Sequence, residues 1–204
     1  EDDEVVVYVE APMERETALE SIHRAGENPP ETFVRDGRHA RERSIVTVIR
    51  AYQRRDPAFA ALVARNDRNA NGIPDQNLDE VYDSLFASPA GDRARQYLTE
   101  DRRSARVVYA VKADEPDAVV AADTRLVAER YRTGATATGQ IVVFDAISAI
   151  IFESALVSLA LALAGTALFL LLVYRVLEGR ASLGLANLVP VVVTVALVAG
   201  SMRY

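Results

Sequence analysis

The chain of 204 residues contains 29 acidic and 23 basic side chains, has a formal net charge of −6, and contains no cysteine. The acidic balance disfavours binding to nucleic-acid phosphates, and the lack of cysteine excludes disulfides, thiolate metal ligands and thiol nucleophiles. Residues 155–174 and 181–202 contain no charged side chain, whereas the preceding part is rich in them. The composition therefore predicts a soluble domain of ordinary size followed by a membrane segment.

The first half of the soluble part predicts one strand followed by helices. The β-branched run EVVVYVE at residues 4–10 is typical of a buried strand, and residues 14–25 have helical spacing of apolar side chains. Prolines and a glycine predict a loop over residues 28–37. Beyond this loop the pattern predicts four short helices, over residues 44–54, 56–63, 77–86 and 92–98.

The second half returns to alternating strands and helices. Residues 106–112 (RVVYAVK) predict a strand, residues 114–132 an amphipathic helix, and residues 136–143 a third strand. The inward side chains expected on that helix are Val119, Ala122, Leu126, Val127 and Tyr131. The whole pattern predicts an α+β domain over residues 1–143, a split β-α-β (ferredoxin-like) sandwich with a helical insert at about 38–103.

Two apolar runs near the end of the chain are long enough to cross a bilayer, which needs ~20 apolar residues. We expect the spans at about 154–174 and 181–202. No helix breaker separates residue 144 from the first span, so residues 144–204 are predicted to form a connecting helix and a transmembrane hairpin. Small residues in the first span suit close helix packing, and Pro190 predicts a kink in the second. An amide at Asn187 is expected to face other helices rather than lipid.

The connector RVLEGR, residues 175–180, sets the expected orientation. Its two arginines against one glutamate favour the cytoplasmic side of the membrane. We therefore predict a multi-pass protein of the cell membrane with residues 1–150 extracytoplasmic. The chain begins without methionine and stops just after an apolar run, which indicates a fragment of a longer protein.

The sharpest local motif is the loop at residues 67–79, DRNANGIPDQNLD. Oxygen-bearing side chains occupy loop positions one, three, five and nine, a glycine occupies position six, and position seven offers a backbone carbonyl, as in DxDxDG calcium loops. Leu78 stands where an EF-hand has a bidentate glutamate, although Asp79 or Glu80 could substitute after a small shift. The candidate ligands of a structural Ca²⁺ are Asp67, Asn69, Asn71, Ile73, Asp75 and Asp79. The alternative is an Asn-Gly turn in which Asn77 caps the next helix.

The remaining sequence contains no pattern typical of an active site. His23 and His39, the two histidines, are sixteen residues apart and have no metal-ligand spacing. The chain lacks a GxSxG motif and a glycine-rich phosphate loop. We therefore predict no catalytic residues, no enzyme activity and no cofactor besides the structural Ca²⁺.

The C-terminal block is similar to a known family of transporters. The segments GQIVVFDAISAIIFESA (residues 139–155), RVLEGR and NLVPVVVTVALVAG (residues 187–200) resemble the resistance–nodulation–division (RND) superfamily, specifically MMPL-like exporters with a sterol-sensing-type helix bundle. The upstream domain matches this family in pattern only. The insert NANGIPDQNLDEVYD resembles salt-adapted archaeal members.

This resemblance implies proton-driven export of lipids or other hydrophobic molecules. In the family the external domain is a porter domain, and two such domains with twelve helices make one protein. The chain would then supply one porter domain and either the second and third or the eighth and ninth helices. Its implied partners are the bilayer, the remaining helices, the second porter domain and the substrate. The proton-relay residues of the family lie on a later helix, so none is transferred to this chain.

Two alternative functions remain open at this point. One is a sterol-sensing or protein-translocation accessory protein with the same helix bundle. The other is a membrane-anchored extracellular binding module, in which the hairpin is only a tether. Asn187, Pro190 and the small residues of the first span argue against a tether, because a tether requires no polar or kinked span.

Overall fold

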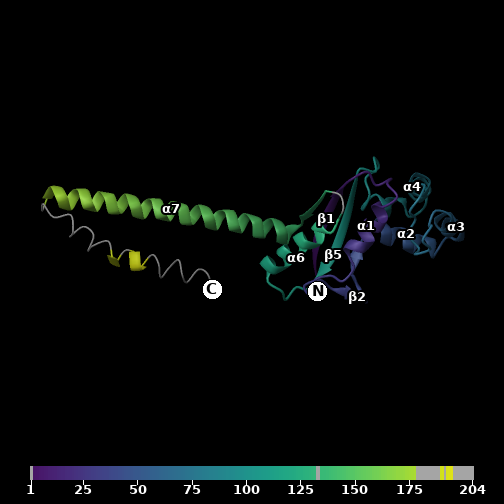
Figure 1. Ribbon diagram of the computed structural model, residues 1–204, viewed down its shortest axis with the longest axis horizontal. Coiled ribbons are helices and arrows are strands. Elements are labelled where there is room, and N and C mark those ends of the chain that lie inside the picture. Colours follow the sequence, from purple (N-terminus) through teal and green to yellow (C-terminus); the bar gives the residue numbers. More distant parts are fainter. Residues whose placement is uncertain (1, 132–133, 178–188, 191, 195–204) are drawn as a thin grey trace. The chain divides into compact units, whose positions relative to one another are not determined.

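The computed structural model describes residues 2–131, 134–177, 189–190 and 192–194 (Figure 1). The chain divides into two compact units, Glu1–Ala146 and Ile147–Tyr204. The first unit is a mixed α+β domain, and the second contains most of one long apolar helix. The two units are described separately below.

The first unit is built around a four-stranded antiparallel sheet with the order β4-β5-β1-β6. The central strands are β1 (Asp3–Glu10) and β5 (Ser104–Val111), which pair along their whole length. The edge strands are β4 (Glu42–Arg43), beside β5, and β6 (Ala135–Thr138), beside β1. Both predicted central strands are therefore present, and each is hydrogen-bonded along both edges.

Alternation along β1 decides which face of the sheet is covered. Val5, Val7 and Val9 are buried on one face, whereas Tyr8 points to the other face and is 45% exposed. The helices α1 (Ala18–Ala25) and α6 (Asp117–Glu129) pack on the valine side, where Tyr109 of β5 lies opposite Val5. The core of the domain is therefore the layer between this sheet face and its helices.

The expected insert is helical but not entirely so. Its four predicted helices are present, and Ser44 begins the first of them with a capping box formed with Thr47. Asp56 begins the second by accepting backbone N–H bonds from the first turn. The segment also contains a two-stranded hairpin and the edge strand β4, which the sequence did not predict. The bounds are β2 (Arg35–Asp36), β3 (His39–Ala40), α2 (Ile45–Gln53), α3 (Pro57–Arg65), α4 (Leu78–Phe86) and α5 (Gly91–Ala94).

The strand predicted over residues 136–143 is too long. It ends at Thr138, because Gly139 adopts a left-handed φ of +113° and the helix α7 begins at Gln140. A Cβ atom at Gly139 would lie 3.4 Å from the backbone nitrogen of Val6, so the chain turns where only glycine fits well. Val142 is buried within the first unit as a helical residue rather than as part of a strand.

The inward face predicted for α6 is partly wrong. Val119 and Leu126 are 45% and 54% exposed, whereas Val127 and the following Tyr131 are buried as expected. The buried side of the helix consists mostly of small residues, which allow the backbone to approach the sheet closely. These buried residues are Val120, Ala121, Thr124, Val127 and Ala128.

One helix among the described residues, α7 (Gln140–Leu177), is long and apolar enough to cross a membrane. Its 38 residues correspond to roughly 57 Å at 1.5 Å per residue, more than the ~30 Å of a bilayer core. The predicted first span lies within this helix. The connector beyond Leu177 and most of the second predicted span lie outside the described residues, although residues 189–190 and 192–194 are helical.

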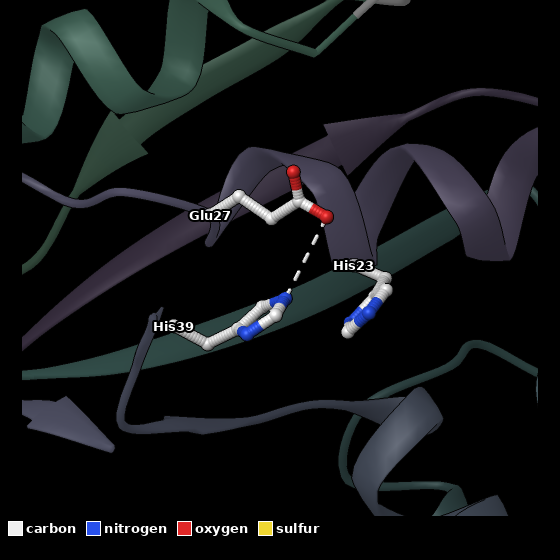
Figure 2. A group of neighbouring side chains, drawn as sticks. All are labelled: His23, Glu27 and His39. Carbon is white, nitrogen blue, oxygen red and sulfur yellow. Dashed lines mark ion pairs between the residues drawn. The ribbon is translucent and has the colours of Figure 1, made fainter. Parts of the chain in front are cut away.

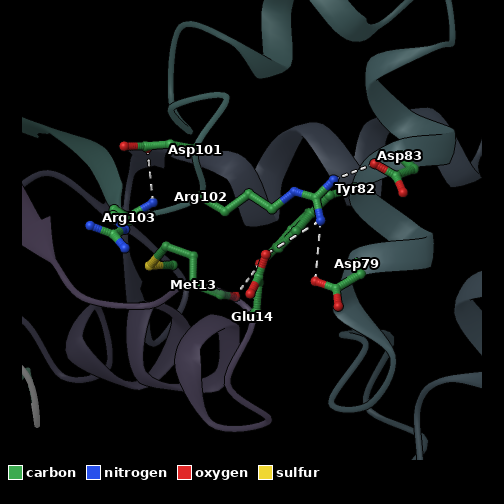
Figure 3. Close-up of polar contacts among 8 residues, drawn as sticks. All are labelled: Met13, Glu14, Asp79, Tyr82, Asp83, Asp101, Arg102 and Arg103. Carbon is green, nitrogen blue, oxygen red and sulfur yellow. Dashed lines mark hydrogen bonds and ion pairs between the residues drawn. The ribbon is translucent and has the colours of Figure 1, made fainter.

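Arg102, just before β5, connects the segment after β1 with the helix α4 (Figure 3). Its guanidinium contacts Glu14 after β1 at 3.4 Å, Asp79 of α4 at 3.2 Å, and Asp83 one turn further along α4. The same group lies over the ring of Tyr82, whose hydroxyl donates to the carbonyl oxygen of Met13. Only 18% of the arginine side chain is exposed, so solvent screens these contacts less than a surface pair.

We expect Arg102→Ala to lower the free energy of unfolding by about 1–3 kcal/mol, because three carboxylates would lose their shared cation. Arg68→Ala is the matched control, because Arg68 makes one exposed ion pair, with Glu16. This substitution should lower the free energy of unfolding by less than about 1 kcal/mol. Urea unfolding followed by tyrosine fluorescence measures both variants. Equal destabilisation by the two substitutions would contradict the central role of Arg102.

Candidate functional site

The loop at residues 67–79 brings the side-chain oxygens of three of its six predicted ligand residues, Asp67, Asn69 and Asn71, into one turn. Both carboxylate oxygens of Asp67 accept backbone N–H bonds, from Asn71 at 3.3 Å and from Gly72 at 2.7 Å. The Oδ1 of Asn69 also accepts from the Asn71 nitrogen, and the Oδ1 of Asn71 accepts from the Ile73 nitrogen. Gly72 has a φ of +80°, so the turn requires glycine at this position.

The other predicted ligands are placed differently. Asp75 accepts a hydrogen bond from the Arg68 backbone nitrogen across the loop, at 3.1 Å. The side chain of Ile73 is buried, as expected if only its carbonyl faces the loop. Asp79 lies on α4 and pairs with Arg102, away from the turn. The loop thus gathers Asp67, Asn69, Asn71 and Asp75 without Asp79, and Ca²⁺ binding there stays a prediction.

The alternative interpretation of this loop is half correct. The Asn-Gly turn is present, but Asn77 makes no side-chain capping bond to α4. Its Nδ2 donates instead to the Oδ1 of Asn66, a buried residue whose carbonyl accepts the Asp75 and Gln76 nitrogens. Asn66 and Asn77 therefore join the two ends of the loop.

A second polar cluster lies between β4, β5 and the end of α6. Glu42 of β4 is the register partner of Tyr109 of β5, and the Tyr109 and Tyr131 hydroxyls are 2.7 Å apart. The Oε1 of Glu42 accepts a bond from the Ser44 hydroxyl, whereas its Oε2 is shielded from solvent and has no hydrogen-bond partner in the described part of the chain. A Cβ atom at Gly26 would lie 3.0 Å from this oxygen, so the glycine leaves room for the carboxylate.

The environment of this cluster changes its acid–base properties. Burial raises the pKa of Glu42 to about 7, although the Ser44 hydroxyl and the charge of Arg50 oppose the shift. Burial also raises the pKa of Tyr109 and of Tyr131, so both phenols stay neutral at physiological pH. Glu42 is therefore a carboxyl group that changes charge near neutrality. The sequence pattern did not identify it, because an acidic residue on a short edge strand is usually solvated.

The two histidines, which are far apart in the sequence, lie against each other in the structure. The His23 and His39 rings stack with centroids 4.5 Å apart, and Glu27 lies beside them. Burial, followed by the charges of Arg50 and His39, lowers the pKa of His23. The sequence spacing of these histidines gave no sign of this cluster, because the turn after α1 and the β2–β3 hairpin bring them together only in the fold.

The membrane-related surface of the chain is α7. Among its described residues the apolar side chains are largely exposed, including Leu161, Leu168, Phe169 and Leu172. Gly165 lies among small residues of the same helix, and a Cβ atom added there meets no described atom within 4 Å. This surface can contact lipid or another helix.

Comparison with known proteins identifies no match: no family model, curated protein or solved structure is similar to the chain.

We expect Asp67→Ala to lower the free energy of unfolding by about 1–2 kcal/mol even in the presence of a chelator, because two backbone N–H groups lose their acceptor. If the loop also binds Ca²⁺, adding the ion raises the melting temperature of the parent chain but not of this variant. Asp79→Ala should retain the effect of Ca²⁺, since Asp79 pairs with Arg102. A melting temperature that Ca²⁺ leaves unchanged in the parent would refute the calcium prediction.

At pH 8, Glu42→Gln should raise the free energy of unfolding above that of the parent chain. At pH 4.5 the difference between variant and parent should be much smaller. The folded pKa of about 7 lies above the ordinary value of 4.5, so ionisation of Glu42 progressively destabilises the fold as the pH rises between these values. Above pH 7 the cost is about 2–3 kcal/mol, which glutamine removes while keeping an oxygen for Ser44. Urea unfolding at the two pH values measures the difference. The exposed Glu129→Gln is the control, and an equal pH response in both variants would exclude a buried carboxylate at position 42.

Proposed function

We propose that this chain is the porter domain and adjacent membrane helices of an RND-type, MMPL-like exporter of lipids or other hydrophobic molecules, driven by a proton gradient. Residues 1–150 would lie outside the cytoplasm, and the connector at residues 175–180 would lie inside. The other parts of the transporter would be further helices and a second porter domain. The energy-coupling residues would belong to those parts rather than to this chain.

The observation that carries this proposal is the strand order of the sheet followed directly by an apolar helix. In the order β4-β5-β1-β6, the crossover from β1 through α1 to β4 skips β5, and the crossover from β5 through α6 to β6 skips β1. This is the order of a split β-α-β sandwich, which is the fold expected of a porter subdomain. The helical insert then lies in the connection between β4 and β5.

The junction between β6 and α7 also supports the proposal. Within the first unit, Val142 is buried and Asp145 accepts from Arg125 of α6 at 2.9 Å, so the beginning of α7 is anchored to the domain. The same helix continues without interruption into the apolar segment. A continuous helix from an external domain into the bilayer would transmit movement of the domain to the membrane, which a flexible linker would not.

The small residues of α7 distinguish a bundle helix from a simple tether. Ala160, Ala162, Ala164, Gly165 and Ala167 lie within one stretch, and small residues allow helices in lipid to approach closely. Because a Cβ atom at Gly165 meets no described atom, a larger side chain there would disturb only a helix outside the described residues.

The test uses membrane vesicles containing the whole protein to which this chain belongs. An imposed pH gradient should drive movement of a fluorescent lipid probe, and a protonophore should abolish it. Gly165→Leu should reduce this rate about tenfold or more without preventing membrane insertion, because leucine would separate helices that pack at the glycine. Leu172→Ile is the control, since it conserves volume on an exposed position of the same helix.

A single cysteine reports the orientation independently, because the chain has none of its own. Glu100→Cys should react with an impermeant maleimide in intact cells, whereas Glu178→Cys should react only after permeabilisation.

An unchanged transport rate in the Gly165→Leu variant would favour the tethered binding module. Gradient-independent binding of the probe would instead indicate the accessory protein.

A further inference from the structure

We propose that His23, Glu27 and His39 form a binding site for a divalent transition-metal ion such as Zn²⁺, with water completing the coordination. One ligand atom from each side chain lies within 4.8 Å of the others (Figure 2). Two imidazoles and one carboxylate are a donor set that Zn²⁺ accepts, and imidazole equally suits Ni²⁺ and Cu²⁺. The site does not depend on the transport proposal.

The backbone aligns two of the three ligands. Glu27 and His39 face each other across an antiparallel bridge, which is extended by bonds from the Asn28 nitrogen to the Arg38 carbonyl and from the Ala40 nitrogen to the Gly26 carbonyl. Their side chains therefore project side by side. The third ligand, His23, precedes Glu27 by four residues, one turn earlier at the end of α1.

The turn that carries Glu27 is itself fixed. The Nη1 of Arg130 donates to the carbonyl oxygens of Ala25, Glu27 and Asn28 as the chain leaves α1. This single arginine, just beyond α6, holds the segment between His23 and the bridge to His39. A preformed ligand geometry reduces the entropy lost when an ion binds.

The Nε2 atom of His39 is available as a metal ligand. The Nε2 of His39 is shielded from solvent and has no hydrogen-bond partner among the described residues, and the Oε1 of Glu27 lies 3.7 Å from it. That separation is too long for a hydrogen bond. It is close to the roughly 3.3 Å between two ligand atoms that bind one tetrahedral ion at about 2.0–2.1 Å each. The two rings stack with their planes only 13° apart. Because an imidazole binds a metal ion in the plane of its ring, His23 must turn out of the stack about its side-chain bonds to reach the same ion, on a backbone that is already in place.

The charges around the cluster are mixed. Arg50 acts on His23 as a positive charge, while Glu20 and Glu27 act as negative charges. The Glu20 carboxylate is already engaged by Arg24 and by the Asn71 amide. Glu27 is therefore the anion that is available to balance a bound cation. Its side chain is 48% exposed, so an ion can reach the site from solvent.

The full chain, purified in detergent without a histidine tag, should bind Zn²⁺ with a stoichiometry of one in isothermal titration calorimetry. Because it contains two histidines and no cysteine, any imidazole ligation must involve this cluster. The imidazole ¹⁵N resonances should shift on adding Zn²⁺, and Co²⁺ should give visible absorption bands of a low-coordinate site. Unshifted imidazole resonances at saturating Zn²⁺ would overturn the proposal, whatever heat is observed.

Variants distinguish this site from binding by surface carboxylates. His23→Gln, His39→Gln and Glu27→Gln should each weaken Zn²⁺ binding by about tenfold or more, since each removes one of three ligands. Glu31→Gln is the matched control, because Glu31 is an exposed acid in the adjoining loop. Asp67→Ala should also leave Zn²⁺ affinity unchanged, which separates this site from the calcium loop. Equal affinity in the parent and both histidine variants, each shown to be folded by circular dichroism, would refute the site.

Discussion

The pairing of β1 with strands on both of its edges is the constraint on which the first unit depends. β1 bonds to β5 over eight residues and to β6 over four, so it joins segments that lie about a hundred or more residues later in the chain. Its buried valines then provide the surface on which α1 and α6 pack. Because pleating alternates side chains, a shift of one residue in this register would expose the valines and bury Tyr8.

Contacts between distant segments also create several polar sites in the domain. Arg102 joins the segment after β1 to α4, Arg130 joins the end of α6 to the turn after α1, and Glu42 enters the core beside Tyr109. The Arg102 guanidinium and the Glu42 carboxyl are partly removed from water, where their interactions are stronger and an unmatched charge costs more. The His23–Glu27–His39 cluster lies at the same junction as Glu42, between the end of α1 and the edge of the sheet. Because burial raises the pKa of Glu42 to about 7, this junction is a part of the domain that responds to protons near neutral pH.

Much of the fold follows from local pattern. The β-branched runs of β1 and β5, the capping residues Ser44 and Asp56, and the long apolar run of α7 each indicate their element without reference to the rest of the chain. The calcium-like loop was also visible, because Asp67, Asn71 and Gly72 form their turn with near neighbours. Local hydrogen bonds and periodicity are properties of short segments, so a single sequence reveals them.

Local sequence patterns alone indicate the α+β domain, its main strands and helices, and the long apolar helix that follows it. They do not indicate the edge strand β4, the early end of β6 or the side of α6 that faces the sheet. They also do not indicate that His23 meets His39 or that Glu42 is buried. These features escape a single sequence because strand pairing, close helix approach and burial depend on segments far apart in the chain. Gly139 shows the limit clearly: its φ of +113° ends β6 at Thr138, just before α7 begins, and the presence of a glycine does not by itself reveal that conformation.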